Sequence, residues 1–264
     1  MSVDRFILLY HTMLHVCHSD PETSGRGHKI TPLISTLIEK FNEHYEPYQE
    51  ISVDESMIGF KGRVIFRMYC PKKPTKWGLL VKTVACPHTG YLLNAHLYCG
   101  RNDDRNVEPG LTKTEQYFLD LLTPFANKGH HVFCDRLYSS VTLAEKLYER
   151  KFHVTGTIMP NRKHLPAEIK NPSGIQKGEI RAFRSSNILC LCWKDKRVVT
   201  MISTYHKGNE TIIKNVRGRG DAEKPVVVEE YNKHMSEVDL HDQMNKYYDH
   251  SRKSVKWWKK VFFG

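Results

Sequence analysis

The chain has 264 residues, of which 40% are hydrophobic and 26% are charged. These values are typical of a folded protein with a sizeable core, and they exclude wholesale disorder. No apolar run approaches the roughly 18–20 residues that span a bilayer, and Met1 to Leu9 lacks the pattern of a signal peptide. We therefore expect a soluble intracellular protein with no membrane partner.

The formal net charge is +11, which favours a polyanionic partner such as nucleic acid. The alternative is an ordinary basic protein, or a fragment whose acidic segment is missing. The seven cysteines are scattered and form no C-x-x-C pair, which argues against a disulfide framework and against a structural zinc site. Cys190 and Cys192 lie two apart in an apolar stretch, so we expect both on one buried face of a strand.

The chain begins with two predicted amphipathic helices, over Asp4–Val16 and Ile30–Tyr45, separated by a loop rich in proline and glycine. From about residue 50 to residue 100 the pattern changes to a meander of antiparallel strands. The first run reads "EISVDESMIGFKGRVIFRMYCP", with a turn expected at Lys61–Arg63 between two strands. Two further strands follow, "KWGLLVKTVAC" and "GYLLNAHLYCG", joined by a turn that begins at Pro87.

A helix is predicted over Thr112–Asn127, where Thr112 and Glu115 have the spacing of a capping box. The strand "HHVFCD", the helix "SSVTLAEKLYERK" and the strand "FHVTGTI" come next. The order of three strands, helix, strand, helix and strand is that of an RNase H-like fold. Beyond Pro160 we expect three strands of a small β insertion, then a flexible basic loop, "HKGNETIIKNVRGRGDAEKP", and helix from about Val226 to the end.

Three separate elements each offer a carboxylate. Asp54 lies inside a strand-like run where aspartate is disfavoured, Asp135 ends a buried strand, and Asp239 and Asp242 share one face of the late helix. Taken alone, each has an ordinary interpretation: Asp54 as a surface residue, Asp135 as a helix N-cap, and the late pair as a solvated helix face. The order central strand, strand tip and late helix is what brings acids together on an RNase H-like sheet.

Such a cluster suits phosphodiester chemistry, because Mg²⁺ or Mn²⁺ ions need oxygen ligands. Two ions about 3.5–4 Å apart activate the attacking oxygen and stabilise the leaving one. Carboxylates held together without cations would repel one another, so clustering them is costly unless metal binds. We therefore predict that Asp54, Asp135 and Asp239 hold metal, with Asp242 beside them.

Three ordered blocks carry a family resemblance. The run "VDESMIGFKGRVIFRMYCPKKPTKWG" is similar to the opening block of the piggyBac transposase family. "FCDRLYSS" resembles its second-aspartate block, and "VVVEEYNKHMSEVDLHDQMNKYY" resembles its third. The match covers most of the chain.

The resemblance implies an α/β fold: an RNase H-like mixed sheet with a β-rich insertion domain and flanking helices. It implies a DDE/D-type DNA transposase core in which Asp54, Asp135 and Asp239 form the catalytic triad and Asp242 supports the metal site. The family excises a mobile element by strand cleavage, passes through hairpin ends and joins the element to TTAA targets, as a dimer. A Mg²⁺ or Mn²⁺ cofactor, double-stranded DNA as partner, a homodimer and a nuclear location are the corresponding expectations.

The resemblance also divides the chain. We expect a partial dimerisation and DNA-binding segment, the first part of the catalytic core, the β-rich insertion, and the final core helix with the last acids, over residues 1–48, 49–159, 160–224 and 225–264. The family has longer ends, so we expect a fragment, a truncated gene product or a domesticated copy. Two alternatives to an active transposase core stay open: a domesticated DNA-binding protein without transposition, and a generic RNase H-like nuclease.

Basic and aromatic residues are candidates for DNA contacts. The basic residues near Asp54 and in the insertion would bind phosphates, or they form a solvated surface; they are Arg63, Arg67, Lys72, Lys73, Lys76, Arg162, Lys163, Arg217 and Arg219. The four tryptophans would stack on bases, although core packing is the better expectation; they are Trp77, Trp193, Trp257 and Trp258. No role is assigned to His130, His131 or His241, because the DDE/D mechanism needs no histidine.

Overall fold

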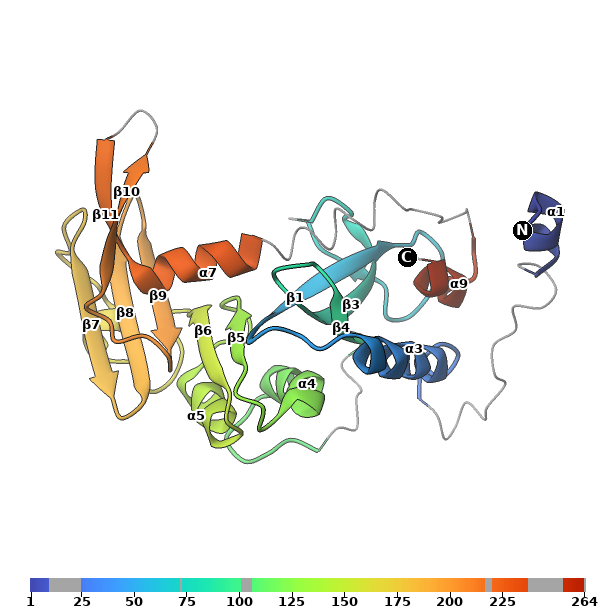
Figure 1. Cartoon of the computed structure of the whole chain (residues 1–264), viewed down its shortest axis with the longest axis horizontal. Helices are drawn as coiled ribbons and strands as arrows, with labels where there is room; N and C mark the ends of the chain where they lie inside the picture. The colour runs from blue at the N-terminus through green and yellow to red at the C-terminus, as the bar shows by residue number, and fades with distance from the viewer. Residues whose placement is uncertain (10–24, 72, 101–105, 217–219, 237–253, 264) are drawn as a thin grey trace.

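A computed structural model describes the chain except for residues 10–24, 72, 101–105, 217–219, 237–253 and 264. Nine of the described strands form one mixed sheet in an α/β fold (Figure 1). Five of these strands form one part of the sheet, in the order β4-β3-β1-β5-β6. Their bounds are β1 Glu50–Gly59, β3 Trp77–Ala85, β4 Leu92–Leu97, β5 His131–Cys134 and β6 His153–Thr157.

The first three of these strands are antiparallel and the last two are parallel to β1. β1 pairs antiparallel with β3 and parallel with β5, and β5 pairs parallel with β6. The two connections after β4 and β5 run through helices, α4 (Lys113–Leu122) and α5 (Val141–Glu149), because parallel strands require crossovers. This is the RNase H-like arrangement that the sequence predicted.

Local sequence explains where these helices begin. Thr112 caps α4, and its hydroxyl and the Glu115 carboxylate complete the predicted capping box. A short 3₁₀ turn, η2 (Thr123–Phe125), ends that segment. Ser140 caps α5 by accepting a hydrogen bond from the Leu143 N–H at 3.1 Å. Asp135 is therefore not the N-cap of α5, which removes one ordinary interpretation of this aspartate.

The predicted β insertion is continuous with the main sheet. Its strands are β7 (Ile180–Ser185), β8 (Ile188–Lys194) and β9 (Val198–Ser203), and β9 pairs antiparallel with β6. The short helix α6 (Ala167–Lys170) precedes them. As predicted, Cys190 and Cys192 are buried and face the same cluster of core side chains.

The stretch predicted as a flexible loop forms a hairpin instead. β10 (Thr211–Val216) and β11 (Gly220–Pro225) pair antiparallel over six residues each and lead directly into α7 (Val226–Ser236). The β-branched run at the start of β10, "TII", supplies the strand preference that the surrounding charged residues obscure. The helix start at Val226 agrees with the sequence.

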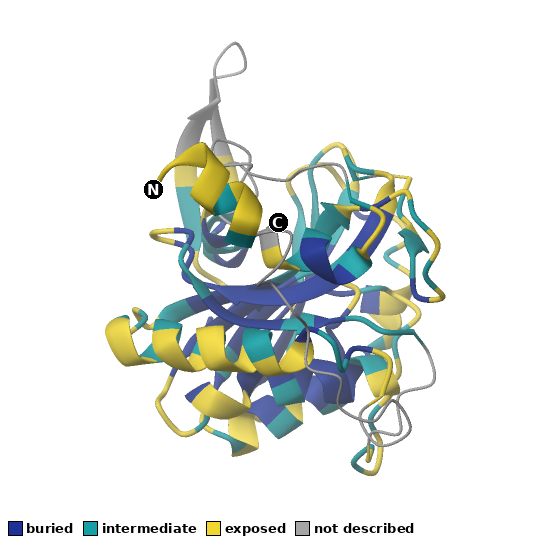
Figure 2. Cartoon of the chain, turned by 90° about the vertical axis from the view of Figure 1, so that its right-hand side faces the viewer, coloured by how far each residue is buried: buried dark blue, intermediate teal, exposed yellow. Residues whose placement is uncertain are grey.

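The two faces of the sheet are covered differently. Helices α4 and α5 cover one face, over a core that includes Ile51, Val53, Phe118 and Leu147. The other face is covered by α3 (Thr31–His44), α7 and α9 (Trp257–Phe263), in two smaller apolar clusters. Figure 2 shows the buried strands in the middle of the molecule and the exposed outer side of the helices.

One expectation about the N-terminal half needs correction. The strand predicted after Lys61–Arg63 is not the hairpin partner of β1; only β2 (Met68–Tyr69) forms there, and it pairs with β3. Phe60 and Phe66 are instead buried in the cluster beneath α3 and α9, which holds the connecting segment as a loop. The first helix, α1, covers Val3–Leu8, and residues 10–16 of the predicted helix lie outside the described residues. No helix in the described part of the chain combines the length and apolar character that a membrane crossing requires.

Candidate active site

Asp54 and Asp135 lie side by side on adjacent parallel strands. Val53 of β1 is in register with Cys134, the last residue of β5, and Asp54 and Asp135 directly follow these two residues. Neighbouring strands run about 4.8 Å apart. Burial raises the pKa of Asp54 above its ordinary value, and the negative charge of Asp135 adds to the rise. The sheet therefore brings together two of the four predicted carboxylates.

The turn after β5 fixes the direction of the Asp135 side chain. One carboxylate oxygen of Asp135 accepts a hydrogen bond from the Leu137 N–H, which is the bonding pattern of an Asx turn. The backbone oxygen of Asp135 accepts a bond from the Ser139 hydroxyl at 3.1 Å. Arg162 donates to the Leu137 carbonyl at 2.5 Å, so this arginine braces the turn. The backbone of this turn is thereby held on three sides.

Gly156 on β6 makes room for the same turn. A Cβ atom at this position would lie 2.6 Å from the Cys134 carbonyl oxygen and 2.6 Å from the Ser139 hydroxyl. Both atoms belong to the segment that carries Asp135. Any larger residue would therefore push on the segment that positions the second aspartate.

A lysine serves as the counter-ion of Asp54. β5 ends at Cys134, so β1 has no strand partner on that side beyond Val53. Lys73, from the loop between β2 and β3, approaches this open edge and donates to the Glu55 carbonyl at 2.7 Å. Its ammonium lies 3.6 Å from one carboxylate oxygen of Asp54, and its positive charge lowers the pKa of Asp54, against the larger effect of burial. This contact agrees with the predicted location of Lys73 near the first aspartate.

Sequence reasoning missed Glu55 and Tyr138. The Tyr138 hydroxyl donates to the Glu55 carboxylate, and Tyr138 is fully buried against Phe118. Burial raises the pKa of Glu55 to about 7; the bond from Tyr138 opposes the rise, and the charges of Asp54 and Asp135 add to it. The available signal was an acid next to Asp54 in "VDES" and a tyrosine three residues after Asp135 in "FCDRLYSS".

Helix α7 packs on the face of the sheet to which Asp54 points. Ser52 is fully buried, and its hydroxyl donates to the His234 carbonyl, near the C-terminal end of α7, at 3.1 Å. Residues two apart on a strand share a face, so Ser52 and Asp54 both point to the α7 side. The predicted acids Asp239 and Asp242 follow α7 but lie outside the described residues.

The next described helix, α9, packs on the same face of the sheet. Its buried Trp258 shares an apolar cluster with Val81 of β3, which is in register with Ser56, two residues beyond Asp54. The two described helices α7 and α9 therefore both cover the face that carries Asp54.

The donor set of the described site suits a hard cation. Asp54 and Asp135 offer carboxylate oxygens, the ligands that Mg²⁺ and Mn²⁺ prefer, and their mutual repulsion is relieved by positive charge. In the described part of the chain, no three His, Cys, Asp or Glu side chains come close enough to hold a metal ion.

The predicted tryptophans and histidines lie in different environments. Trp257 and Trp258, the first two residues of α9, pack in an apolar cluster as expected, whereas Trp77 is 48% exposed. His131 is buried beside β6, and its Nε2 lies 2.8 Å from the Thr155 hydroxyl. His241, Arg217 and Arg219 lie outside the described residues, as does Lys72.

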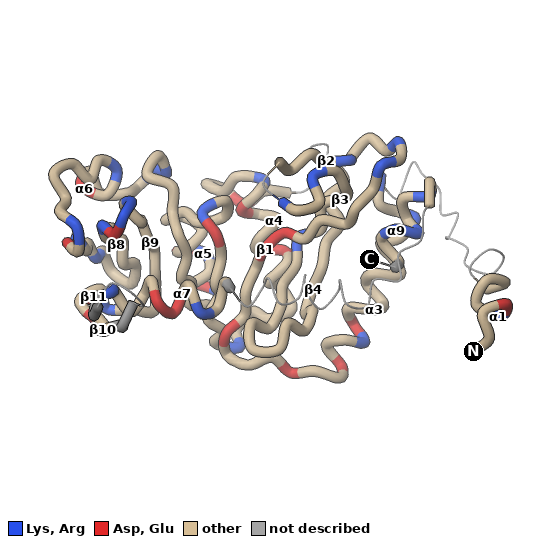
Figure 3. Tube along the Cα trace, turned by 90° about the horizontal axis from the view of Figure 1, so that it is seen from above, with Lys and Arg blue, Asp and Glu red and all other residues tan. Residues whose placement is uncertain are grey.

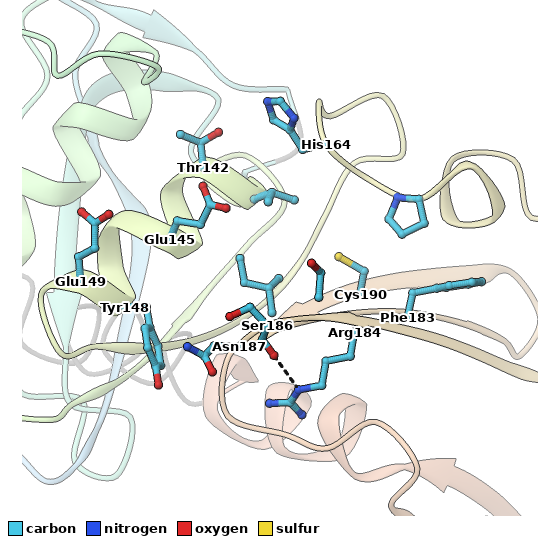
Figure 4. Close-up of a pocket in the computed structure, with 14 residues that line it drawn as sticks. Thr142, Glu145, Tyr148, Glu149, His164, Phe183, Arg184, Ser186, Asn187 and Cys190 are labelled. Carbon is cyan, nitrogen blue, oxygen red and sulfur yellow. Dashed lines mark hydrogen bonds between the residues drawn. The ribbon is translucent and has the colours of Figure 1, made fainter.

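A cavity of about 840 Å³ lies apart from this site. It lies between α5 and the β7–β8 hairpin and is lined by Glu145, Tyr148 and Arg184 among others (Figure 4). Arg184 donates to the Ser186 carbonyl at 3.3 Å and to the His206 carbonyl at 3.0 Å. The cavity borders the α5 face of the sheet, opposite the face that carries Asp54.

Comparison with known proteins identifies relatives over nearly the whole chain. A family model described as Transposase IS4 matches residues 1–264. The human PiggyBac transposable element-derived protein 3 is 25% identical over 281 aligned residues, which cover 98% of this chain and 45% of the relative. The human PiggyBac transposable element-derived protein 2 is 25% identical over 97% of this chain and 45% of its own length.

A solved structure agrees with both. The cryo-EM structure of a piggyBac transposase synaptic complex with hairpin DNA matches with a TM-score of 0.79 and 27% identity, over 92% of this chain and 49% of that one. The chain thus spans about half the length of the relatives it matches.

Proposed function

This chain belongs to the Transposase IS4 family, and on that basis we propose that it forms the DDE/D-type catalytic core of a piggyBac-like DNA transposase. The proposed reaction is metal-dependent cleavage and transfer of DNA strands. The observation that carries the proposal is that Asp54 and Asp135 directly follow Val53 and Cys134, which are in register on two adjacent parallel strands.

In this proposal Asp54, Asp135 and Asp239 hold Mg²⁺ or Mn²⁺, with Asp242 beside them. The bound ions would supply an activated attacking oxygen and a stabilised leaving oxygen at the scissile phosphate. The chain's own residues keep the two described carboxylates aimed at one place, through the Asx turn at Asp135 and the pleat of β1. Lys73 balances the charge of Asp54 before metal and DNA arrive.

The packing of α7 and α9 supports the assignment of the late acids. Asp239 is five residues after His234, whose carbonyl is bonded to Ser52, and Ser52 is two residues before Asp54 on the same face. A chain that leaves α7 at this point has only a short distance to cover to reach Asp54. We infer that Asp239 and Asp242 complete the site from this side.

Calorimetric titration of the purified chain with Mn²⁺ tests the site. We expect the unmodified chain to bind, and Asp54→Asn, Asp135→Asn and Asp239→Asn each to weaken binding at least roughly tenfold, since each removes one charged ligand. Asp195→Asn, in the β8–β9 turn, removes the same charge elsewhere and should leave binding unchanged. If Asp135→Asn bound Mn²⁺ as tightly as the unmodified protein, the assignment would be abandoned.

We further propose double-stranded transposon ends and TTAA sites as the DNA partners, a homodimer as the active form, and the nucleus as the location. The second candidate function is a domesticated DNA-binding protein without transposition, favoured by relatives that are named as derived from a transposable element. Metal-dependent nicking of a transposon-end duplex that disappears in Asp135→Asn would decide for the transposase. Equal cutting of unrelated duplexes would instead indicate a generic RNase H-like nuclease.

A further inference from the structure

A groove of about 1130 Å³ lies at the far end of β1 from the aspartates. One wall is the loop after β1 and the loop that enters β3, and the other is the segment that begins α9. Figure 3 shows that lysine and arginine gather at this end of the molecule, around β2 and on α9. Nothing in the proposed catalytic site uses this groove.

The lining is strongly basic. Five lysines border the groove, and the residues described as lining it include no aspartate or glutamate; the five are Lys61, Lys76, Lys256, Lys259 and Lys260. Lys61, Lys76 and Lys256 are exposed at its rim. The exposed lysine charges attract polyanions, and the counter-ions of the nucleic acid are released when its phosphates bind to them.

The floor and walls are apolar, which simple charge attraction does not require. Phe60 is buried at the base, while Trp77 and Val255 are 48% and 86% exposed. Trp77 is part of an exposed stack, with the Arg67 guanidinium 4.8 Å from its ring centre and the Tyr69 ring at 4.6 Å. An exposed aromatic wall below a lysine rim is the combination that holds unpaired nucleotides, which present both phosphates and base faces.

The groove is joined to Asp54 by two short stretches of chain. Along β1, Asp54 and Gly59 are five residues apart, or roughly 17 Å at strand spacing. Along the loop before β3, Lys73 contacts Asp54 while Lys76, three residues later, lines the groove. A DNA strand with its scissile phosphate at Asp54 is therefore within reach of the lysine rim.

We propose that this groove binds an unpaired stretch of the DNA strand that runs to the cleavage site. The exposed lysines contact its phosphates, and the exposed side chains of Trp77 and Val255 contact its bases. The proposal rests on the proposed function, because it assigns a path for the DNA on which that function acts. It predicts that single-stranded DNA binds this chain without metal.

The test measures the affinity of the full chain for fluorescein-labelled oligothymidylate in the presence of EDTA. Fluorescence anisotropy reports the binding, and the titration is repeated over a range of salt concentrations. Lys256→Glu combined with Lys76→Glu should weaken binding at least roughly tenfold and reduce the salt slope by roughly 1.4, since each phosphate contact contributes about 0.7 for single strands. Lys128→Glu combined with Lys170→Glu makes the same change of net charge on surfaces away from the groove. That control should change the affinity less than roughly threefold, and unchanged circular dichroism spectra establish that both variants fold.

Tryptophan emission tests the aromatic wall. Unlabelled oligothymidylate should quench the emission of the unmodified chain, and Trp77→Phe should lose a large part of that quenching. Equal weakening by the two double variants would overturn the proposal, because binding would then follow net charge alone. So would a groove variant that loses affinity for a duplex but keeps it for oligothymidylate. Because the assay contains no metal, it gives the same answer whether or not the Mn²⁺ titration supports the catalytic site.

Discussion

Ser52→Ala should loosen α7 from the sheet beside Asp54. The Ser52 hydroxyl is fully buried and donates at 3.1 Å to the His234 carbonyl, near the C-terminal end of α7. Removing the donor leaves a buried carbonyl oxygen without this bond, at a cost of about 1–3 kcal/mol. For a chain of this size each kcal/mol lowers the melting temperature by roughly 2–4 °C.

The variant separates positioning from ligation, since Asp54 and Asp135 are untouched. Urea unfolding should show the loss of stability, and Mn²⁺ titration should show weaker binding than in the unmodified chain, because α7 leads into the segment that bears Asp239. Ser185→Ala, at the exposed end of β7, is the matched control and should change neither quantity. A Ser52→Ala protein of normal stability and normal Mn²⁺ affinity would refute the view that α7 is anchored to the site by this bond.

Three further outcomes are expected. Gly156→Ala should cost about 1–3 kcal/mol in urea unfolding and weaken Mn²⁺ binding, because the new Cβ meets the Cys134 carbonyl and displaces the segment that carries Asp135; wild-type behaviour in both would contradict this. Tyr138→Phe should cost about 0.5–1.5 kcal/mol, because the bond to Glu55 is lost, and an unchanged urea midpoint would show that the bond contributes nothing. Burial lowers the pKa of His131 to about 2. Below about pH 6.5 the unfolded chain therefore binds a proton at His131 that the folded chain does not bind, so the stability of the fold decreases as the pH falls. From pH 7 to pH 5.5 this amounts to about 1 kcal/mol, which His131→Gln should remove; equal pH slopes for the two proteins would contradict the assignment.

Local signals in the sequence were sufficient for most helices and strands. The Thr112 and Glu115 pair fixes the start of α4, because the capping box needs only residues three apart. The strands β3 to β9 follow from their β-branched and apolar runs. The hairpin β10–β11 was missed because lysines, glycines and acids in the same stretch mask its single β-branched run.

Pairing between distant strands could not be predicted from local pattern. The turn-like Lys61–Arg63 suggested that β1 folds back on the next segment, yet β1 pairs with β3 over eight residues, from Ser52 to Gly59. The nine-residue β3 offers β1 a longer partner than any segment between them, and Phe60 and Phe66 gain burial when the intervening chain stays a loop. The continuous pairing of β9 with β6 is likewise a long-range choice that no local signal encodes.

Some residues of the candidate site could be predicted from local sequence, and others could not. Asp54 and Asp135 stood out because acids are uncommon in strands and at buried strand ends, and an RNase H-like order of elements requires those positions to meet. Glu55 and Tyr138 did not stand out, because their bond depends on the pairing of β1 with β5. β5 stops at Cys134 and leaves the edge of β1 open, where Lys73 reaches the Glu55 carbonyl. Lys73 reaches Asp54 from that open edge, while α7 packs on the face of the sheet to which Asp54 points. We therefore expect a strand of DNA to reach these carboxylates along β1, from the end of the strand that carries the lysine groove.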